Sequence, residues 1–286
     1  MSSKSILSGL KISILGAGNM GQALTRGLVE KSVYPQNISI YDIDSKKMAQ
    51  LKKELSVKIA KTSRHCVSLA DIVILAVKPQ ILPEAIAEVA SSLGKETLIL
   101  SIAAGVPISK IEEYLSVRGG AGVGGKKPMA IIRVMPNMPA LVGAGMSAYS
   151  LGKHASAKDR KIAEAILAAL GEYVQVPEKM IDLVTAISGS GPAYFFLLTE
   201  KMIEAAYEMG MKVDVAKKLV YQTAFGSGKI LAQSDEDPET LIARVASKGG
   251  TTEAALKVFQ RKGFGKIIQD AVKAAHRRSI ELREGK

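Results

Sequence analysis

The sequence predicts an α/β fold in which a doubly wound parallel sheet is followed by an all-helical domain. A short apolar run, Ile12–Leu15, enters a glycine-rich turn and then a helix. Short apolar segments alternate with amphipathic ones as far as about residue 177, and beyond it the pattern is continuously helical. We therefore expect a Rossmann-like, dinucleotide-binding domain over residues 1–177 and a helical domain over residues 178–286.

The first strand is expected at Ile12–Leu15, and the turn that follows it, residues 16–21, reads Gly-Ala-Gly-Asn-Met-Gly. In such a strand–turn–helix unit the first glycine permits the turn. The second glycine lets backbone amides approach a pyrophosphate, and the third lets the helix pack on the strand. The free amides and the positive end of the helix dipole favour phosphate. A bound dinucleotide is the prediction, and a tight turn that binds nothing is the alternative.

The composition limits the class of protein. A chain of 286 residues with 47% hydrophobic content is long enough for two domains. Residues 1–11 lack a signal-peptide core and no apolar run reaches the length of a membrane span, so we expect a cytoplasmic protein without a membrane partner. Cys66 is the single cysteine, which excludes intrachain disulfide bonds and a cysteine metal cluster. We interpret Cys66 as a small buried residue and expect no metal.

The chain is basic, with 39 lysines and arginines against 27 acids and a net charge of +12. The lysines are scattered, aromatic residues make up only 5%, and no nucleic-acid-binding motif is present. We therefore expect no nucleic acid partner. The scattered charge indicates a solvated surface that attracts an anionic cofactor.

Strands and helices alternate along the first domain. Further strands are predicted at residues 38–41, 72–77, 98–102, 131–135, 146–149 and 173–176, and helices at residues 44–55, 83–93, 109–115 (capped by Ser109) and 158–170. Strands this apolar are buried on both faces, which is typical of a parallel sheet covered by helices. A nucleotide binds at the carboxyl ends of such strands.

Two acids, Asp42 and Asp44, follow the second strand. An acid at this place accepts hydrogen bonds from an adenosine ribose, and its charge repels a 2′-phosphate. We therefore expect Asp42 to bind the ribose and the two acids to favour NADH over NADPH, although Lys46 and Lys47 offset this charge. A helix cap is an equally good interpretation of Asp44.

Three loops follow other strands at the same expected edge of the sheet. They are Lys78-Pro79, residues 103–107 (Ala-Ala-Gly-Val-Pro) and residues 136–139 (Pro-Asn-Met-Pro). Small residues and prolines provide rigid backbone that a flat ring can approach closely. Residues 118–127 are also rich in glycine, but they lack the Gly-Lys-Ser/Thr ending of a phosphate loop and precede a strand. They predict a flexible surface loop.

The second domain is predicted as a series of helices. They run from Pro192 to Gly210, from Asp214 as cap to about Gln233, briefly from Asp237-Pro238, and over residues 252–260 and 264–282. These helices are rich in alanine and methionine and have apolar faces. Helices of this kind bury such faces against a second subunit, so we expect at least a homodimer.

One segment of the helical half, residues 247–252 (Ser-Lys-Gly-Gly-Thr-Thr), has the composition of an anion site. Two glycines and three hydroxyls directly before a helix present free amides and hydroxyls to a carboxylate. A threonine-capped helix behind an ordinary glycine turn explains the same residues equally well.

Six motifs match one known family in order and spacing. Besides residues 16–21 and 247–252 they are residues 76–79 (Ala-Val-Lys-Pro), 101–105 (Ser-Ile-Ala-Ala-Gly), 133–137 (Arg-Val-Met-Pro-Asn) and 188–194 (Ser-Gly-Ser-Gly-Pro-Ala-Tyr). Over essentially its whole length the chain resembles pyrroline-5-carboxylate reductase. The resemblance implies the last step of proline biosynthesis, in which NADPH or NADH transfers hydride to the imine carbon of 1-pyrroline-5-carboxylate and gives L-proline.

The chemistry of the residues agrees with this reaction. A protonated cyclic imine already accepts hydride well and needs no strong general base, whereas oxidation of an alcohol does. The three histidines, His65, His154 and His276, lie in none of the six motifs. Positioning of the two reactants is therefore expected to dominate catalysis.

The resemblance also implies roles for individual residues. The pyrophosphate would be bound by Gly16, Gly18, Asn19, Met20 and Gly21, and the ribose and nicotinamide would be lined by Val77, Lys78, Pro79, Ala103, Ala104 and Asn137. Ser247, Gly249, Gly250 and Thr251 would bind the substrate carboxylate, and Ser190, Gly191 and Pro192 would shape the pocket. Thr252 would contact the imine nitrogen as the catalytic residue, with water as a rival proton donor. In this family the helical domain forms dimers with the site at their interface, and larger rings of dimers occur.

The chain departs from the family pattern at four places. Lys248 replaces the usual proline, Met138 replaces a threonine, and residues around Gly122 are an insertion. Asp42 and Asp44 stand where members that prefer NADPH carry hydroxyl or basic residues. Three other functions stay open: a related β-hydroxyacid-dehydrogenase-like or cyclic-imine reductase with Lys201 as its nearest candidate lysine, a dinucleotide-binding regulator without activity, and a nucleic-acid-binding protein.

Overall fold

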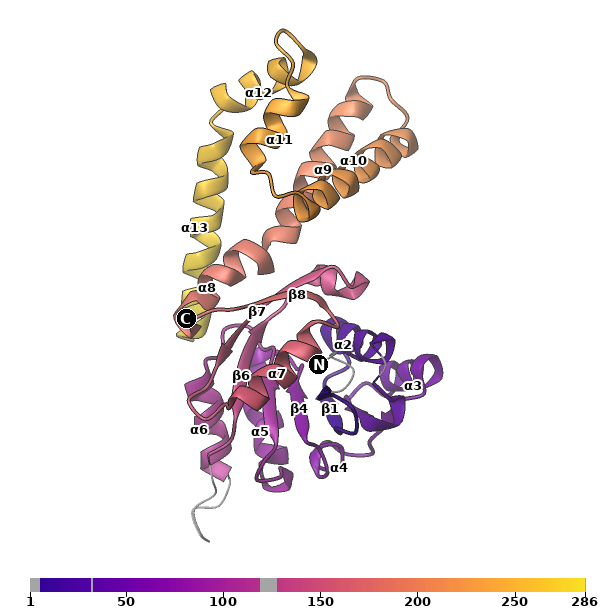
Figure 1. The fold of residues 1–286 in the computed structure, drawn as a ribbon, viewed down its shortest axis with the longest axis vertical. Coiled ribbons are helices and arrows are strands. Elements are labelled where there is room, and N and C mark those ends of the chain that lie inside the picture. The colour runs from indigo at the N-terminus through magenta and orange to yellow at the C-terminus, as the bar shows by residue number, and fades with distance from the viewer. Residues whose placement is uncertain (1–5, 32, 119–127, 286) are drawn as a thin grey trace. The chain divides into compact units, whose positions relative to one another are not determined.

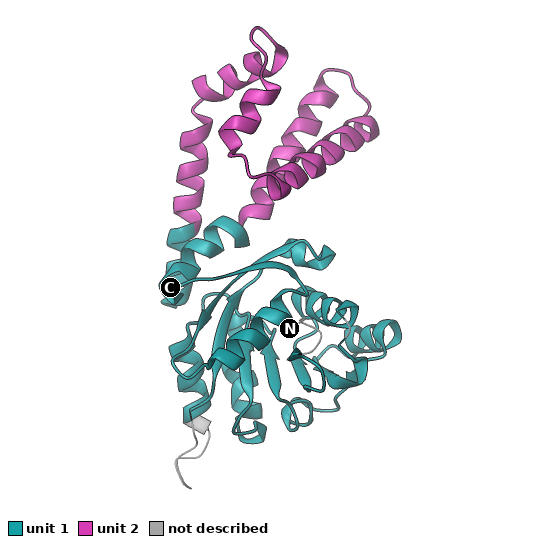
Figure 2. Ribbon diagram, in the orientation of Figure 1, with its two compact units in different colours: residues 1–189, 276–286 teal, residues 190–275 magenta. Residues whose placement is uncertain are grey.

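The computed structural model of the protein describes residues 6–31, 33–118 and 128–285. The predicted loop around Gly122 therefore lies outside the described residues. The chain divides into two compact units, residues 1–189 with 276–286 and residues 190–275 (Figure 2).

The first unit is built on one eight-stranded sheet (Figure 1). Its strand order is β3-β2-β1-β4-β5-β6-β7-β8. The strands are β1 (Ile12–Leu15), β2 (Ile38–Tyr41), β3 (Lys58–Ile59), β4 (Ile72–Leu75), β5 (Leu98–Ser101), β6 (Ile131–Met135), β7 (Gly145–Leu151) and β8 (Gly171–Gln175). The chain starts at β1 and builds outward on both sides of it, as the doubly wound prediction requires.

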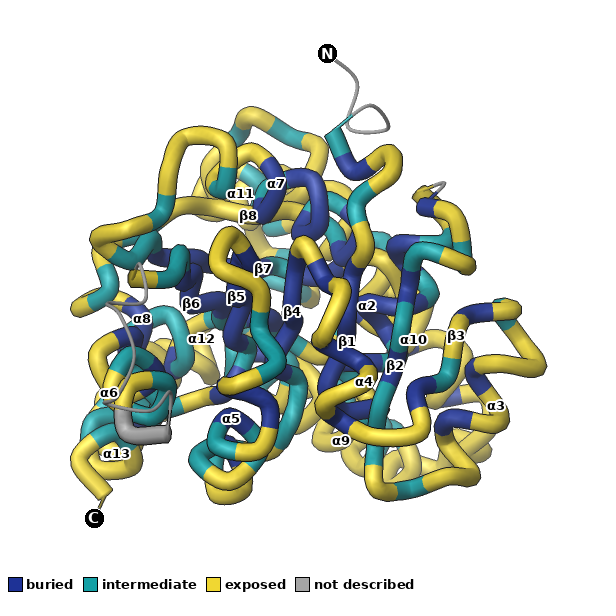
Figure 3. The backbone as a smooth tube through the Cα atoms, turned by 90° about the horizontal axis from the view of Figure 1, so that it is seen from below, coloured by how far each residue is buried: buried dark blue, intermediate teal, exposed yellow. Residues whose placement is uncertain are grey.

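Helices cover both faces of this sheet. They are α2 (Asn19–Glu30), α3 (Ser45–Leu55), α4 (Ser63–Val67), α5 (Leu82–Val89), α6 (Ile108–Arg118), α7 (Ala157–Leu167) and α8 (Ile181–Val184). Side chains from α2, α3 and α7 share one buried cluster with Ile12 and Ile14. Side chains from α4, α5 and α6 share a second cluster with Leu15 and Val73. The central strands are buried on both faces as a result (Figure 3).

The prediction gave the wrong direction for one strand of the sheet and missed a strand at one edge. β6 and β7 pair antiparallel, while the other neighbouring strands pair parallel. The connection between β6 and β7 holds only a short 3-10 turn, Met138–Val142, and a short connection joins antiparallel strands. The strand β3, with two residues, and the helix α4, with five, were missed because segments this short show no hydrophobic periodicity.

Two predicted helix caps were also wrong. Helix α6 already begins at Ile108, so Ser109 lies inside it, and the Ile108 amide donates to the Glu178 carboxylate at 2.8 Å. Helix α10 is preceded by Lys212, and Asp214 lies in its first turn. In both cases the residue still lies at a helix N-terminus, but its side chain does not accept a hydrogen bond from the free amides of the helix.

The second unit contains helices with almost no interior of their own. They are α9 (Gly191–Glu208), α10 (Val213–Gln233), α11 (Pro238–Val245) and α12 (Thr251–Arg261), and α13 (Phe264–Arg283) begins here and ends in the first unit. Only Gly191, Ala216 and Val220 are buried among residues 190–275. Large apolar side chains such as Phe195 and Phe225 are about two-thirds exposed, at 66% and 65%. Exposed apolar surface of this extent is typical of an interaction surface.

One helical stretch, Glu178–Glu208, contains an 18-residue window with a mean hydropathy of 1.4, and by length and composition it could cross a membrane. The prediction that no apolar run reaches the length of a membrane span missed this stretch, because the stretch consists of several helical segments that join end to end. They are a 3-10 turn (Glu178–Met180), α8, a π-helical turn (Thr185–Gly189) and α9. Length and composition alone are weak grounds for a membrane span, and the absence of a membrane partner stays a prediction.

Cys66 is buried, as the sequence predicts, with an exposed fraction of 4%. Burial raises the pKa of the Cys66 thiol to about 12. A thiol that stays protonated at neutral pH is a packing residue and a poor nucleophile. Among the described residues, no group of three His, Cys, Asp or Glu side chains is arranged to hold a metal ion.

Candidate active site

In the glycine turn after β1, backbone atoms pack closely against the backbone of neighbouring segments. Gly16 has a φ of +109°, and its amide donates to the Tyr41 carbonyl at 2.8 Å. A Cβ on Gly16 would lie 2.5 Å from the Ala76 carbonyl oxygen, and one on Gly21 would lie 2.0 Å from the Gly16 oxygen. Both glycines are therefore required by the packing of β1, β4 and α2.

Gly18 differs from these two glycines because it faces open space. No atom lies within 4 Å of the position that its Cβ would take. Gly18 precedes α2 without a side-chain cap, and the first turn of α2 holds no acid. The first-turn amides are thus left for an outside acceptor, which fits a pyrophosphate.

Asp42 joins the end of β2 to the glycine turn. Its carboxylate accepts from the Ala17 amide at 2.6 Å and from the Asp44 amide at 2.8 Å. A carboxylate offers about four lone-pair sites, so these bonds leave acceptor capacity for a ribose hydroxyl. Asp44 accepts from the Lys46 amide at 3.0 Å and caps α3, which supports the cap interpretation of that residue.

Three loops extend this edge of the sheet. β1, β4, β5 and β6 are neighbours and run parallel, so the residues after them lie at one edge. Val77, Lys78 and Pro79 follow β4, and Ala103 and Ala104 follow β5. Ala103 is buried while Ala104 is exposed, so Ala104 is the residue of this pair that a ligand can contact.

Asn137, at the end of β6, is a brace within the first unit. Its Nδ2 donates to the Ser188 carbonyl at 3.1 Å, and its Oδ1 accepts from the Met146 amide at 2.8 Å. The side chain thus ties β6 to β7 and to the π-helical turn before α9. Its predicted place beside the nicotinamide stays a prediction. Met138, next to it, is 54% exposed.

Residues 247–252 belong to the second unit and lead into α12. Gly249 has a φ of +75°, and its amide donates to the Glu253 carboxylate at 2.6 Å. The hydrogen bond from Gly249, followed by that from Lys257, lowers the pKa of Glu253. Gly250 precedes α12 without a side-chain cap, and Thr251 and Thr252 lie in its first turn. The threonine-capped alternative is therefore wrong.

The predicted site residues thus fall into two groups. The first unit holds the cofactor group, which lies at the carboxyl ends of adjacent strands. The second unit holds Ser190, Gly191 and Pro192 at the start of α9 together with residues 247–252. Glu178 and Glu253 were missed by sequence reasoning, because neither lies in one of the six motifs.

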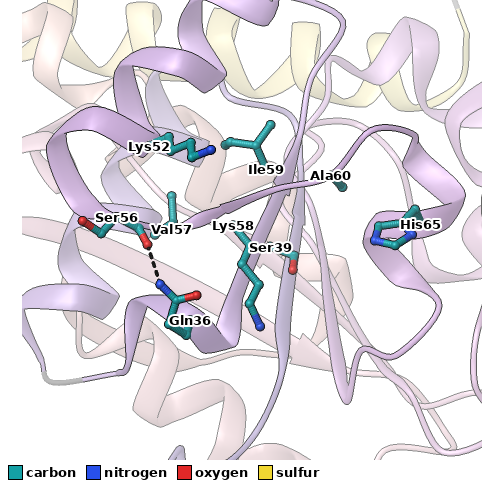
Figure 4. Close-up of a pocket in the computed structure, with 9 residues that line it drawn as sticks. All are labelled: Gln36, Ser39, Lys52, Ser56, Val57, Lys58, Ile59, Ala60 and His65. Atoms are coloured by element: carbon teal, nitrogen blue, oxygen red, sulfur yellow. Dashed lines mark hydrogen bonds between the residues drawn. The ribbon is translucent and has the colours of Figure 1, made fainter.

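A separate pocket of about 510 Å³ lies at the open edge of the sheet beside β3 (Figure 4). Its lining mixes polar and apolar residues and includes Lys52, Lys58 and His65. These three side chains point in different directions and do not converge on one position (Figure 4). The pocket contains none of the predicted site residues, and we assign it no role.

Comparison with known proteins decides the family. A family model for pyrroline-5-carboxylate reductase dimerisation matches residues 178–282, and one for NADP oxidoreductase, coenzyme F420-dependent, matches residues 11–105. The chain is 38% identical over 275 residues to a pyrroline-5-carboxylate reductase of Pseudomonas aeruginosa, which covers 96% of this chain and 97% of the relative. The chain belongs to the pyrroline-5-carboxylate reductase family.

Solved structures of pyrroline-5-carboxylate reductases share the whole fold. The enzyme of Coxiella burnetii aligns with a TM-score of 0.87 at 32% identity and covers 96% of this chain and 98% of its own. The NADP-bound pyrroline carboxylate reductase of Plasmodium falciparum aligns with a TM-score of 0.81 at 30% identity and the same coverage. The predicted family, fold class and NAD(P)-dependent oxidoreductase class are confirmed.

Substitutions at two glycines of this reductase are expected to affect different properties, cofactor binding at Gly18 and stability at Gly27. We expect Gly18→Ala to fold normally, because no atom crowds its Cβ, and to raise the Kd for NADH about tenfold or more by blocking the pyrophosphate. Gly27→Ala is the matched control on the same helix. Its Cβ would lie 2.2 Å from the Ala169 oxygen, which costs about 1–3 kcal/mol of stability.

Thermal unfolding and NADH fluorescence titration of both variants check this prediction. A Gly18→Ala variant that binds NADH as tightly as the unaltered chain would show that no pyrophosphate approaches Gly18.

Proposed function

We propose that the chain reduces 1-pyrroline-5-carboxylate to L-proline with NADH or NADPH. The observation that carries this proposal is the 38% identity to a pyrroline-5-carboxylate reductase over nearly the full length of both chains. All six sequence motifs lie within that length. A hydroxyacid dehydrogenase, a regulator without activity and a nucleic-acid-binding protein have no comparable support.

The first unit would hold the dinucleotide. Its pyrophosphate would be bound by the turn of Gly16, Gly18, Asn19, Met20 and Gly21, and its ribose and nicotinamide by Asp42, Val77, Lys78, Pro79, Ala103, Ala104 and Asn137. When bound, the reduced nicotinamide supplies the hydride. The uncapped first turn of α2 and the open space at Gly18 support this arrangement.

The second unit would hold the substrate. Ser247, Gly249, Gly250 and Thr251 would bind its carboxylate, and Gly250 precedes α12 without a side-chain cap. Thr252 would orient the imine nitrogen or pass a proton to it, while hydride adds to the imine carbon. Ser190, Gly191 and Pro192 would shape the pocket from α9. Lys248 leaves this turn without the φ restraint of a proline.

We further propose that residues 178–286 act as a dimerisation domain beside a dinucleotide-binding domain of residues 1–177. The exposed apolar faces of α9 and α10 and the dimerisation model over residues 178–282 support a homodimer. A partner subunit also explains the apolar surface of Glu178–Glu208 without a membrane. A cytoplasmic location and larger rings of dimers stay expectations.

Oxidation of NADH and of NADPH by the purified protein, followed by absorbance with racemic pyrroline-5-carboxylate, tests the reaction. We expect turnover with at least one cofactor that depends on the imine. A hydroxyacid offered with the oxidised cofactors is the control and is expected to react with neither. Cofactor binding without turnover would favour the regulator instead.

The position of Asp42 at the glycine turn predicts a preference for NADH. Replacing it by serine removes the charge that repels a 2′-phosphate, so Asp42→Ser should raise the ratio of kcat/KM for NADPH to that for NADH about tenfold. Any general loosening of the turn affects both cofactors and cancels in this ratio. Asp44→Ser, which keeps a capping oxygen, is the control and should change the ratio less. An unchanged ratio in Asp42→Ser would leave Asp42 as a brace of the turn only.

Thr252 is expected to act on the substrate and to leave the cofactor unaffected. We expect Thr252→Ala to lower kcat/KM for the imine by about tenfold to a hundredfold, since a hydrogen bond to the reacting nitrogen is lost. The Kd for NADH in the free enzyme should not change. Thr252→Ser keeps the hydroxyl and should retain most activity. Full activity of the alanine variant would remove Thr252 from the site.

A further inference from the structure

The loop of residues 103–107 leads directly into α6, and a carboxylate from a distant segment holds this junction. Glu178 Oε1 accepts from the Ile108 amide at 2.8 Å, although Glu178 is 70 residues away in sequence. The Ile108 amide is one of the free amides at the start of α6, and Glu178 acts as its cap. The position of the loop is therefore coupled to Glu178.

A buried arginine keeps Glu178 in this place. Arg133 Nη1 donates to the same oxygen of Glu178 at 3.2 Å. The Arg133 side chain is only 3% exposed, and its Nη2 has no hydrogen-bond partner in the described part of the chain. If Glu178 turned toward solvent, the buried guanidinium would lose the carboxylate that balances its charge. The alternative rotamers of Glu178 are thus disfavoured, and its bond to Ile108 persists.

A second carboxylate on the same short segment holds the loop from another side. Asp182 Oδ1 accepts from the Ser279 hydroxyl at 2.9 Å, and Asp182 Oδ2 lies 3.3 Å from Arg283 Nη1. These bonds attach the end of α13 to α8. The backbone of Leu282 and Arg283 lies 3.7 Å from the position that a Cβ of Gly105 would take. The end of α13 therefore lies close to the loop at Gly105.

We propose that Glu178 and Asp182 are positioning residues for the cofactor. Glu178 fixes the end of the loop of residues 103–107 that leads into Ile108. Asp182 acts on the same loop through the end of α13, which lies beside Gly105. Together they determine where Ala104 meets the nicotinamide. This role rests on the proposed function, because the loop positions a cofactor only if the dinucleotide binds along this edge. Neither residue belongs to a motif that touches cofactor or substrate.

The test compares two replacements of Glu178. Glu178→Ala removes the acceptor of the Ile108 amide, and we expect the Kd and KM for NADH to rise about fivefold to tenfold while the KM for the imine stays constant. Glu178→Gln keeps an oxygen for that amide but removes the charge that faces Arg133. It should lose thermal stability and still bind NADH within about twofold of the unaltered chain. Glu113→Ala, at an exposed position of α6 that pairs with Lys110, is the control.

A variant at the other contact keeps the test decisive if Glu178→Ala fails to fold. Arg283→Ala releases the end of α13 while Asp182 keeps its bond from Ser279. It should raise the Kd for NADH about threefold, and Arg277→Ala, exposed on the same helix, should not.

Two outcomes would count against different statements. A Kd for NADH that is unchanged in Glu178→Ala and Arg283→Ala, or that is as weak in Glu178→Gln as in Glu178→Ala, would overturn the positioning role. If the unaltered chain binds neither NADH nor NADPH, the proposed function itself fails.

Discussion

Backbone lying against backbone at the glycine turn is the constraint on which the site depends. Gly16 leaves no room for a side chain beside Ala76, and Gly21 leaves none beside the Gly16 carbonyl. These two contacts place the start of α2 directly over the junction of β1 and β4. The uncapped amides of α2, the Ala17 amide that binds Asp42, and the loop after β4 all take their positions from this junction. The candidate cofactor site thus lies where two glycines leave no room for side chains.

Much of the fold could be predicted, because its signals are local. The strands β1, β2 and β6 have the predicted bounds, since each is a short, mostly apolar segment that ends at a turn residue or a charged residue. The predicted start of a short helix at Asp237-Pro238 was right, because a capping side chain followed by proline is a local signal. The direction of β7 was not predictable from its own residues, because direction depends on how the chain returns to the sheet. β3 and α4 were too short for any period to show.

The candidate site divides in the same way. The glycine turn and Asp42 could be placed from sequence, because each directly follows a strand and parallel strands end at a common edge. Their hydrogen bonds could not. Asp42 binds an amide 25 residues away, Asn137 a carbonyl 51 residues away and Glu178 an amide 70 residues away. Such partners are chosen by the tertiary fold, so the sequence did not show that Asn137 also braces β6 against β7 and the turn before α9.

The small interior of residues 190–275 has a consequence for folding. A helical unit in which only Gly191, Ala216 and Val220 are buried gains little free energy from packing within one chain. In the proposed homodimer, most of the stability of these helices would come from the partner, and mass action then makes it depend on protein concentration. Dilution would loosen the helices, while the sheet, whose core lies within one chain, would hold. The dissociated protein would retain the proposed dinucleotide site, whereas the helical unit that carries residues 247–252 would lose its ordered structure.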